Sequence, residues 1–170
     1  PRWLGEKVKH VIEPRLFFRH AAGIEDFDRL ILFDQTELMS NTTEADISIT
    51  NRLYAKRGGE VNEVFSWQLS QRRFFEPSFG GAVAAIDSAT GLPGRNVVLS
   101  SLQVTGLAFL YGPRSYSPVI SVLRANLHSG LGVEWRSDYD PLLRRPVNSM
   151  FQGDWRHSIY SISLGHNYVR

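Results

Sequence analysis

Apolar and polar residues alternate one by one along most of this chain. One copy of the pattern reads Val133-Glu134-Trp135-Arg136, and another reads Tyr160-Ser161-Ile162-Ser163-Leu164. Successive side chains of a β-strand point to opposite faces, so each copy predicts a strand with one apolar and one polar face. The apolar positions carry large aromatic residues, and the polar positions carry Arg, Glu, Asp and Gln. Strands of about ten residues with this alternation, joined by polar loops, are typical of the wall of a transmembrane β-barrel.

Turn residues divide the chain into an expected all-β antiparallel meander of about seven strands. Short turns at Gly58-Gly59, Ser129-Gly130 and His157-Ser158 predict hairpins between neighbouring strands. Pro14 cannot donate to a ladder, so we expect a bulge or a missing pairing there. Seven strands are too few to close a wide barrel, which predicts a curved open sheet. The expected strands cover 8–20, 46–56, 62–74, 118–128, 131–139, 147–156 and the residues from 159 onward.

The connections between these strands fall into two classes. Long polar stretches cover 22–45 and 76–116, and a shorter connection covers 140–146. In such barrels long loops gather at one end and short turns at the other, so we expect the same division here. An apolar run at 30–33 predicts a short packed segment within the first loop, and the segment 97–110 fits either a strand or a loop.

Composition excludes several classes of function. The formal net charge is +2, which gives no electrostatic support to nucleic-acid binding, and the absence of cysteine excludes disulfides and thiolate metal sites. No apolar run reaches the roughly 18 residues of a membrane helix. The first residues lack the apolar segment of a signal peptide and the initiator Met, so we expect a piece of a larger protein.

Motifs for catalysis, cofactors and metals are equally scarce. The sequence contains no GxSxG elbow and no glycine-rich phosphate loop, so we expect neither an enzyme nor a cofactor. Acidic residues of the first long loop do not have the spacing of a Ca²⁺ loop, and a solvated or Arg-paired loop is the favoured interpretation. The histidines lack metal-ligand spacing, so we expect no metal site; they are His10, His20, His128, His157 and His166.

Several short motifs occur in one order along the chain. The run 11–18 reads VIEPRLFF, and a D-x-Q/S/T-x-L element follows at 34–38. Later motifs cover 49–54 (ITNRLY), 68–75 (QLSQRRFF), 135–141 (WRSDYDP) and 147–149 (VNS). In this order they resemble the barrel domain of the outer-membrane lipopolysaccharide-assembly family, LptD (also called OstA or Imp).

This resemblance implies a function and a set of partners. It implies one partial barrel domain over 1–170, from the middle to later wall, in the outer membrane of a Gram-negative bacterium. Such a barrel receives lipopolysaccharide from the periplasmic bridge protein LptA, holds the plug lipoprotein LptE in its lumen and releases its substrate into the outer leaflet. The resemblance further implies that this piece lacks the family's periplasmic jelly-roll, its first strands and its lateral seam, and the family's cysteines have no counterpart in this sequence.

Alternation then assigns candidate residues to each side of the wall. The polar positions predict a lumen lining, and the apolar positions predict contact with membrane lipid. The lumen-facing candidates are Arg15, Arg52, Gln68, Arg72, Arg124, Glu134, Arg136, Asp154 and Arg156. The lipid-facing candidates are Leu16, Phe18, Ile49, Leu53, Phe65, Trp67, Leu69, Leu123, Val133, Trp135, Phe151, Trp155, Ile162 and Leu164.

The arginines of the polar face allow two interpretations. They could attract the phosphates and acidic sugars of lipopolysaccharide. They could instead pair with carboxylates to fill the interior, and Glu13, Glu134, Asp138 and Asp154 are suitable partners. Because the charges of the chain nearly balance, ion pairing is the favoured interpretation.

Other functions remain as alternatives. A passive porin-type channel would show the same alternation, and only the family motifs distinguish it from a lipopolysaccharide translocator. A soluble all-β carbohydrate-binding module would need a second sheet over the aromatic face. A barrel lipase finds no support in the motifs.

Overall fold

The computed structural model describes residues 2–3, 6–23, 41–77, 113–128 and 130–169, and every regular element in this part of the chain is a β-strand. The expected strands are all present, and a two-residue strand precedes them. The strands are β1 (Arg2–Trp3), β2 (Glu6–Ala21), β3 (Thr42–Arg57), β4 (Glu60–Phe74), β5 (Val119–His128), β6 (Leu131–Asp140), β7 (Arg145–His157) and β8 (Tyr160–Val169).

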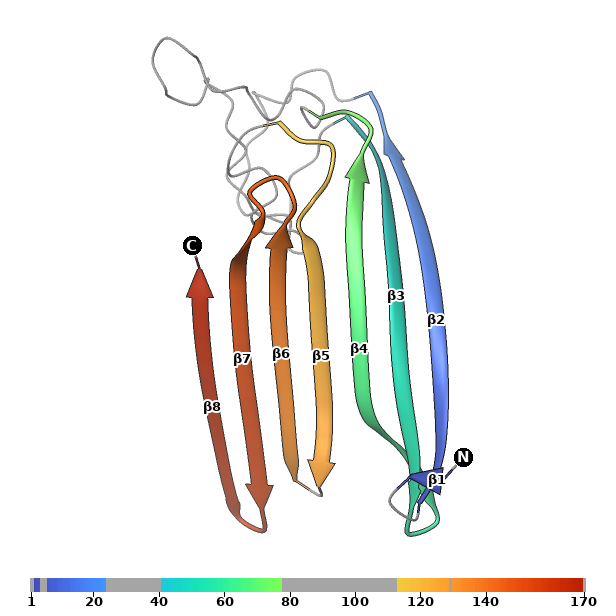
Figure 1. Cartoon of the computed structure of the whole chain (residues 1–170), viewed down its shortest axis with the longest axis vertical. Helices are drawn as coiled ribbons and strands as arrows, with labels where there is room; N and C mark the ends of the chain where they lie inside the picture. Colours follow the sequence, from blue (N-terminus) through green and yellow to red (C-terminus); the bar gives the residue numbers. More distant parts are fainter. Residues whose placement is uncertain (1, 4–5, 24–40, 78–112, 129, 170) are drawn as a thin grey trace. The chain divides into compact units, whose positions relative to one another are not determined.

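These strands form one open antiparallel sheet in the order β1-β2-β3-β4-β5-β6-β7-β8 (Figure 1). Every neighbour in the sheet is also a neighbour in sequence, so the predicted all-β meander is confirmed. The short strand β1, whose two residues pair with Lys7 and Glu6 of β2, was not predicted. Two residues are too few to give an alternating pattern.

Some predicted boundaries are wrong. β3 begins at Thr42, so residues 42–45 belong to a strand and not to the first long loop. This stretch is polar and lacks the alternating apolar signal, but the Thr43 carbonyl accepts a hydrogen bond from the Phe75 N–H at 2.9 Å. β7 begins at Arg145, within the expected connection, and β8 begins at Tyr160. The predictions for 30–33, 34–38 and 97–110 lie outside the described residues.

Contacts between Cα atoms divide the chain into two compact units. Unit 1 contains 1–15, 48–70 and 119–170, and unit 2 contains 16–47 and 71–118. The strands β2, β3 and β4 each contribute one part to each unit.

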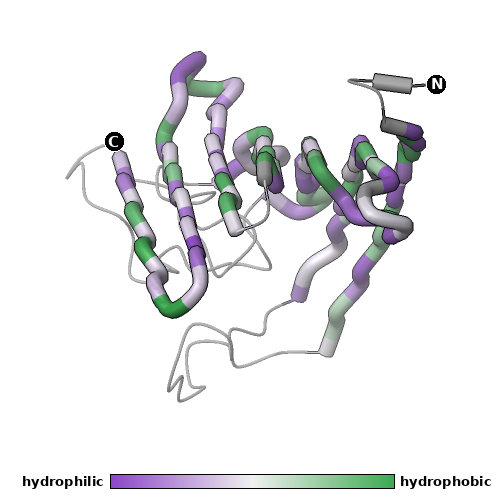
Figure 2. The backbone as a smooth tube through the Cα atoms, turned by 90° about the horizontal axis from the view of Figure 1, so that it is seen from below, coloured by the Kyte–Doolittle hydropathy of each residue, from purple (hydrophilic) through white to green (hydrophobic). Residues whose placement is uncertain are grey.

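The register of unit 1 separates two faces. Trp135 of β6 lies opposite Leu123 of β5 and Phe151 of β7, whereas Glu134 lies opposite Arg124 and Gln152. Cross-strand partners share a face, so these rows define an apolar face and a polar face. Figure 2 shows the underlying alternation as changes of hydropathy along each strand.

Short turns lie together at one end of unit 1. The β3–β4, β5–β6 and β7–β8 turns lie at one end, and the 140–145 turn lies at the other (Figure 1). Gly58 and Gly59 have φ angles of +58° and +92°, as a two-residue hairpin turn with left-handed backbone requires. At the opposite end, the Asp140 carboxylate accepts the backbone N–H of Leu142 at 2.9 Å, which closes that turn. Gly58 and Asp140 therefore lie at opposite ends, as predicted.

Gly130 gives a test of this turn geometry. Its φ is +91°, and an added Cβ would lie 2.0 Å from the Arg156 carbonyl oxygen. We expect Gly130→Ala to lower the free energy of unfolding by at least about 1–2 kcal/mol, the usual cost of left-handed backbone for an L-residue. Urea unfolding followed by tryptophan fluorescence measures the change.

Gly132→Ala is the matched control in the same hairpin. An added Cβ there would meet only the Asn126 side chain, at an ordinary 3.6 Å. We expect its unfolding midpoint to stay near that of the parent chain. Equal midpoints for the two variants would contradict the described backbone of the β5–β6 turn.

Candidate functional site

The apolar face of unit 1 is a continuous surface across strands β4 to β8. The register places ten of the lipid-facing candidates on this one face: Phe65, Trp67, Leu69, Leu123, Val133, Trp135, Phe151, Trp155, Ile162 and Leu164. Ile49 and Leu53 share one face of β3 by alternation, and Leu16 and Phe18 share one face of β2 in unit 2.

None of these apolar side chains is buried. The exposed fractions are 39% for Trp67, 44% for Trp135, 44% for Phe151 and 43% for Trp155. The described part of the chain contains one sheet and no second layer that would cover them. Large exposed apolar surfaces mark contact with a partner or a membrane, so this face is the first candidate functional surface of the molecule.

A row of serines crosses the apolar face. Ser137 of β6 lies opposite Ser121 of β5 and Ser149 of β7. The indole N–H of Trp67 donates to Ser121 Oγ at 3.0 Å, and that of Trp135 donates to Ser149 Oγ at 3.1 Å. Because both indole donors are satisfied within the sheet, these two tryptophans can lie in an apolar medium without an unpaired polar group.

The polar face buries more of its residues than the apolar face does. Ser66 and Asp138 are only 7% and 6% exposed, and the apolar Ile120, which lies opposite Asp138 on the same face, is also buried. Soluble proteins bury large apolar side chains and expose charged ones. Unit 1 departs from this distribution, because Trp67 and Trp135 are exposed while Asp138 is buried.

Ion pairs and hydrogen bonds connect neighbouring strands across the polar face of unit 1. Arg52 pairs with Glu13 of β2 at 3.0 Å and with Glu63 of β4 at 2.7 Å. Arg124 of β5 pairs with Glu134 of β6 at 2.6 Å. The carboxylates of Glu13, Glu63 and Glu134 thus join three pairs of adjacent strands through two arginines.

The same face continues to β7 and β8. Arg136 pairs with Asp138 at 3.0 Å, and the Asn148 amide donates to Asp138 at 3.2 Å. Asp154 has no arginine partner among the described residues, and it accepts from Gln152 at 3.0 Å and from Ser163 at 2.6 Å. Three of the four expected carboxylate partners therefore hold an arginine.

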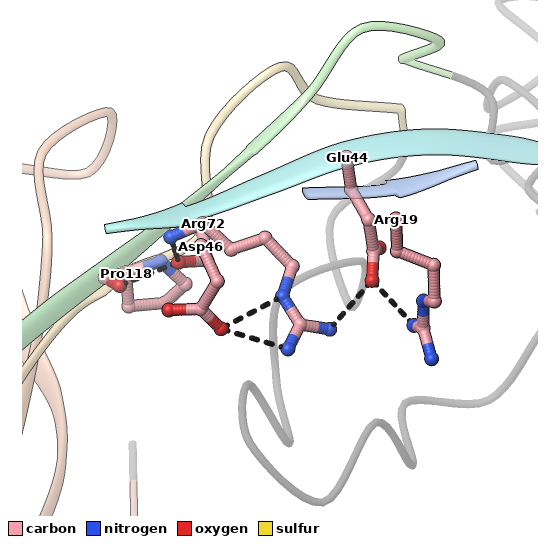
Figure 3. A network of polar contacts seen from close by, with 6 residues as sticks. Arg19, Glu44, Asp46, Arg72 and Pro118 are labelled. Atoms are coloured by element: carbon pink, nitrogen blue, oxygen red, sulfur yellow. Dashed lines mark hydrogen bonds and ion pairs between the residues drawn. The ribbon is translucent and has the colours of Figure 1, made fainter. Parts of the chain in front are cut away.

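Unit 2 contains the most buried charge cluster (Figure 3). The Arg72 guanidinium pairs with Asp46 at 2.9 Å and with Glu44 at 3.2 Å, and the same Glu44 oxygen pairs with Arg19. The exposed fractions of the Arg72 and Glu44 side chains are 10% and 3%. The Arg72 backbone N–H donates to Ser117 Oγ at 2.9 Å, which fixes this end of β4.

The remaining polar candidates are less constrained. Arg15 and Arg156 have no carboxylate partner among the described residues, and both are exposed. Gln68 lies on the polar face opposite Val122. Unit 1 thus brings six of the candidates onto one face, namely Gln68, Arg124, Glu134, Arg136, Asp154 and Arg156.

Sequence reasoning missed some members of these networks. Glu44 and Asp46 are two residues apart in β3 and therefore share a face. Glu44, however, was assigned to the first long loop. Arg73 and Tyr116 were not singled out, although the Arg73 Nη1 donates to Tyr116 Oη at 3.0 Å. Because neighbouring residues of a strand point to opposite faces, the assignment of Arg72 to the polar face already implied that Arg73 lies on the opposite face.

The part of the chain that the structure describes contains neither a metal site nor a membrane-spanning helix. No group of three or more His, Asp or Glu side chains there is arranged to hold a metal ion. No helix long and apolar enough to cross a membrane occurs in the same part of the chain.

Neither of two comparisons with known sequences gives a match. No family model matches the sequence, and no curated protein matches it significantly. The two faces of the sheet are therefore the basis for any functional conclusion.

Arg72 is the central cation of the buried cluster, so its loss should strongly destabilise the fold. Arg72→Met leaves two neighbouring carboxylates without their shared partner, and we expect the free energy of unfolding to fall by about 3–5 kcal/mol. Urea unfolding measures this loss.

Arg124→Met is the matched control, because the Arg124 side chain is 59% exposed in its pair with Glu134. We expect that change to cost at most about 1 kcal/mol. A loss at Arg72 no larger than the loss at Arg124 would show that the cluster of Figure 3 is not a stabilising unit.

Proposed function

We propose that this chain forms part of the wall of an outer-membrane β-barrel, with its apolar face toward lipid and its polar face toward the lumen. The observation that carries the proposal is the burial in unit 1, where large tryptophans are exposed and an aspartate is buried. In a bilayer the exposed side of a barrel is lipid, and the interior is polar. The same arrangement would be unfavourable in water.

Strand length supports the same conclusion. The strands β2 to β8 contain 16, 16, 15, 10, 10, 13 and 10 residues. A tilted strand needs about 9–11 residues to cross the hydrocarbon core, whereas strands of soluble proteins average about 5–6. Every one of these strands is therefore long enough to span a membrane.

The polar face is suited to line a hydrated lumen. Arginine and carboxylate charges alternate across it and neutralise one another, as the pairs of Arg52, Arg124 and Arg136 illustrate. Such a lining offers many hydrogen-bond donors and acceptors without a strong net field. This pairing favours a structural role for most of these arginines over direct binding of phosphate.

The proposed substrate is lipopolysaccharide, which the barrel would insert into the outer leaflet. This part of the proposal depends on the ordered motifs that resemble the LptD family. The motif at 11–18 lies within β2, that at 49–54 lies within β3, and that at 147–149 lies within β7. The plug lipoprotein LptE, the bridge protein LptA and membrane lipid are the proposed partners.

Two adjacent residues of β7 test the orientation of the sheet. Phe151 lies on the apolar face and Gln152 on the polar face. Because the sequence contains no cysteine, Phe151→Cys and Gln152→Cys each accept a single environment-sensitive fluorophore. In bilayers we expect the label at 151 to be quenched by spin-labelled lipid and the label at 152 to be quenched by aqueous iodide.

The two labels control for each other, because they differ by one position in the same strand. Equal quenching by iodide at both positions would contradict a lipid-facing apolar face. That result would favour the soluble carbohydrate-binding alternative.

Depletion of the protein that carries this sequence tests the substrate. We expect lipopolysaccharide at the bacterial surface to fall and to accumulate inside the outer membrane, because insertion would be blocked. Surface labelling of lipopolysaccharide measures the effect. Unchanged surface lipopolysaccharide together with reduced uptake of small solutes would instead identify a passive channel.

A further inference from the structure

Arg73, the penultimate residue of β4, is held by two aromatic rings. Its guanidinium carbon lies 5.1 Å from the centre of the Phe75 ring and 5.4 Å from that of Tyr116. Its Nη1 donates to Tyr116 Oη at 3.0 Å. Among the described residues no acidic side chain pairs with Arg73, although the neighbouring Arg72 has two carboxylate partners.

The backbone of unit 2 fixes this arrangement. Arg73 and Tyr116 form an antiparallel bridge. On either side, the Phe74 N–H donates to the Ser115 carbonyl at 2.8 Å, and the Ser117 N–H donates to the Arg72 carbonyl at 2.9 Å. Ser117 itself is fully buried. The Tyr116 ring is therefore held opposite Arg73 by main-chain hydrogen bonds.

Exposed apolar side chains lie beside the two rings that contact the guanidinium. Phe18 of β2 lies 6.2 Å from Phe75, measured between ring centres. Phe18, Phe75 and Tyr116 are all exposed, as is Leu16, which shares a face of β2 with Phe18. The result is a cation within an apolar surface, which resembles the interface of a membrane in its chemistry.

We propose that Arg73 and Tyr116 bind the phosphate group of an anionic membrane lipid, while Phe18 and Phe75 contact its acyl chains. A guanidinium stacked on aromatic rings keeps a fixed plane, and its remaining N–H donors match two phosphate oxygens. The Tyr116 hydroxyl accepts from Arg73 and can donate its own proton to the phosphate. The lipid source follows from the exposed rings, which a free phosphate ion would leave in water.

The location in β4 fits a headgroup. Arg73 lies one residue before the end of the strand at Phe74, where a long connection begins. A charge on the lipid side of a barrel is costly at the midplane and tolerated near the interface. This inference rests on the proposed lipid contact of the apolar face.

Spin-labelled lipids test the site in the bilayer-reconstituted protein. The measurement is the share of motionally restricted lipid for labelled phosphatidic acid relative to labelled phosphatidylcholine. We expect the parent protein to prefer phosphatidic acid, and we expect Arg73→Gln to reduce this preference by about fivefold, the effect of one arginine near an anionic surface. Tyr116→Phe should reduce it less, because the guanidinium remains.

Lys56→Gln is the charge-matched control, because it removes one positive charge from the exposed end of β3 in unit 1. It should keep the preference for phosphatidic acid. An Arg73→Gln variant that equals the parent protein overturns the proposal. Complete competition by millimolar inorganic phosphate also overturns it, because the site would then select a free ion.

The label at position 151 separates this inference from the proposed function. Lipid quenching at 151 without any effect of Arg73→Gln rejects only the phosphate site. Absence of lipid quenching at 151 rejects the proposed barrel wall as well.

Discussion

Backbone hydrogen bonds between neighbouring strands are the interaction on which the rest of this molecule depends. The described residues bury only a few apolar side chains, namely Ala45, Ala55, Phe74, Ile120 and Val147. A core of this size contributes little hydrophobic stabilisation, so the ladder must hold the chain together. In a medium without water each broken ladder bond costs more, and the same ladder becomes correspondingly stronger. The side chains then determine which medium each face tolerates.

The ion pairs of the polar face act on register more than on stability. Exposed pairs contribute little to the free energy of folding, and the pair of Arg124 with Glu134 is of this kind. Slipping a strand by one residue would turn every charge of that strand toward the apolar side. Arg52 contacts the strands on both sides of β3, so it penalises a slip of either neighbour. The networks thus specify the pairing that the backbone alone would leave free.

The alternation of the sequence was enough to predict the all-β meander, the positions of the long strands and the division of their side chains into two sets. Trp135 and Arg136 illustrate why, since a period of two leaves no choice of face once the strand exists. The partners of individual charges could not be predicted, because they depend on which strands meet. Arg72 and Asp46 are 26 residues apart, and Arg73 and Tyr116 are 43 apart. The start of β3 was missed because Thr42, Thr43 and Glu44 carry no apolar signal.

All ten residues of β8 are exposed, and its outer side has no neighbouring strand among those described. The N–H and C=O groups on that side form a template on which another extended segment can pair. An open sheet of this kind can pair with another chain along that edge. Two copies released into water would therefore pair there and begin an aggregate. Handling of the isolated chain should therefore use conditions that cap the edge, such as a short peptide that repeats the alternation of β7.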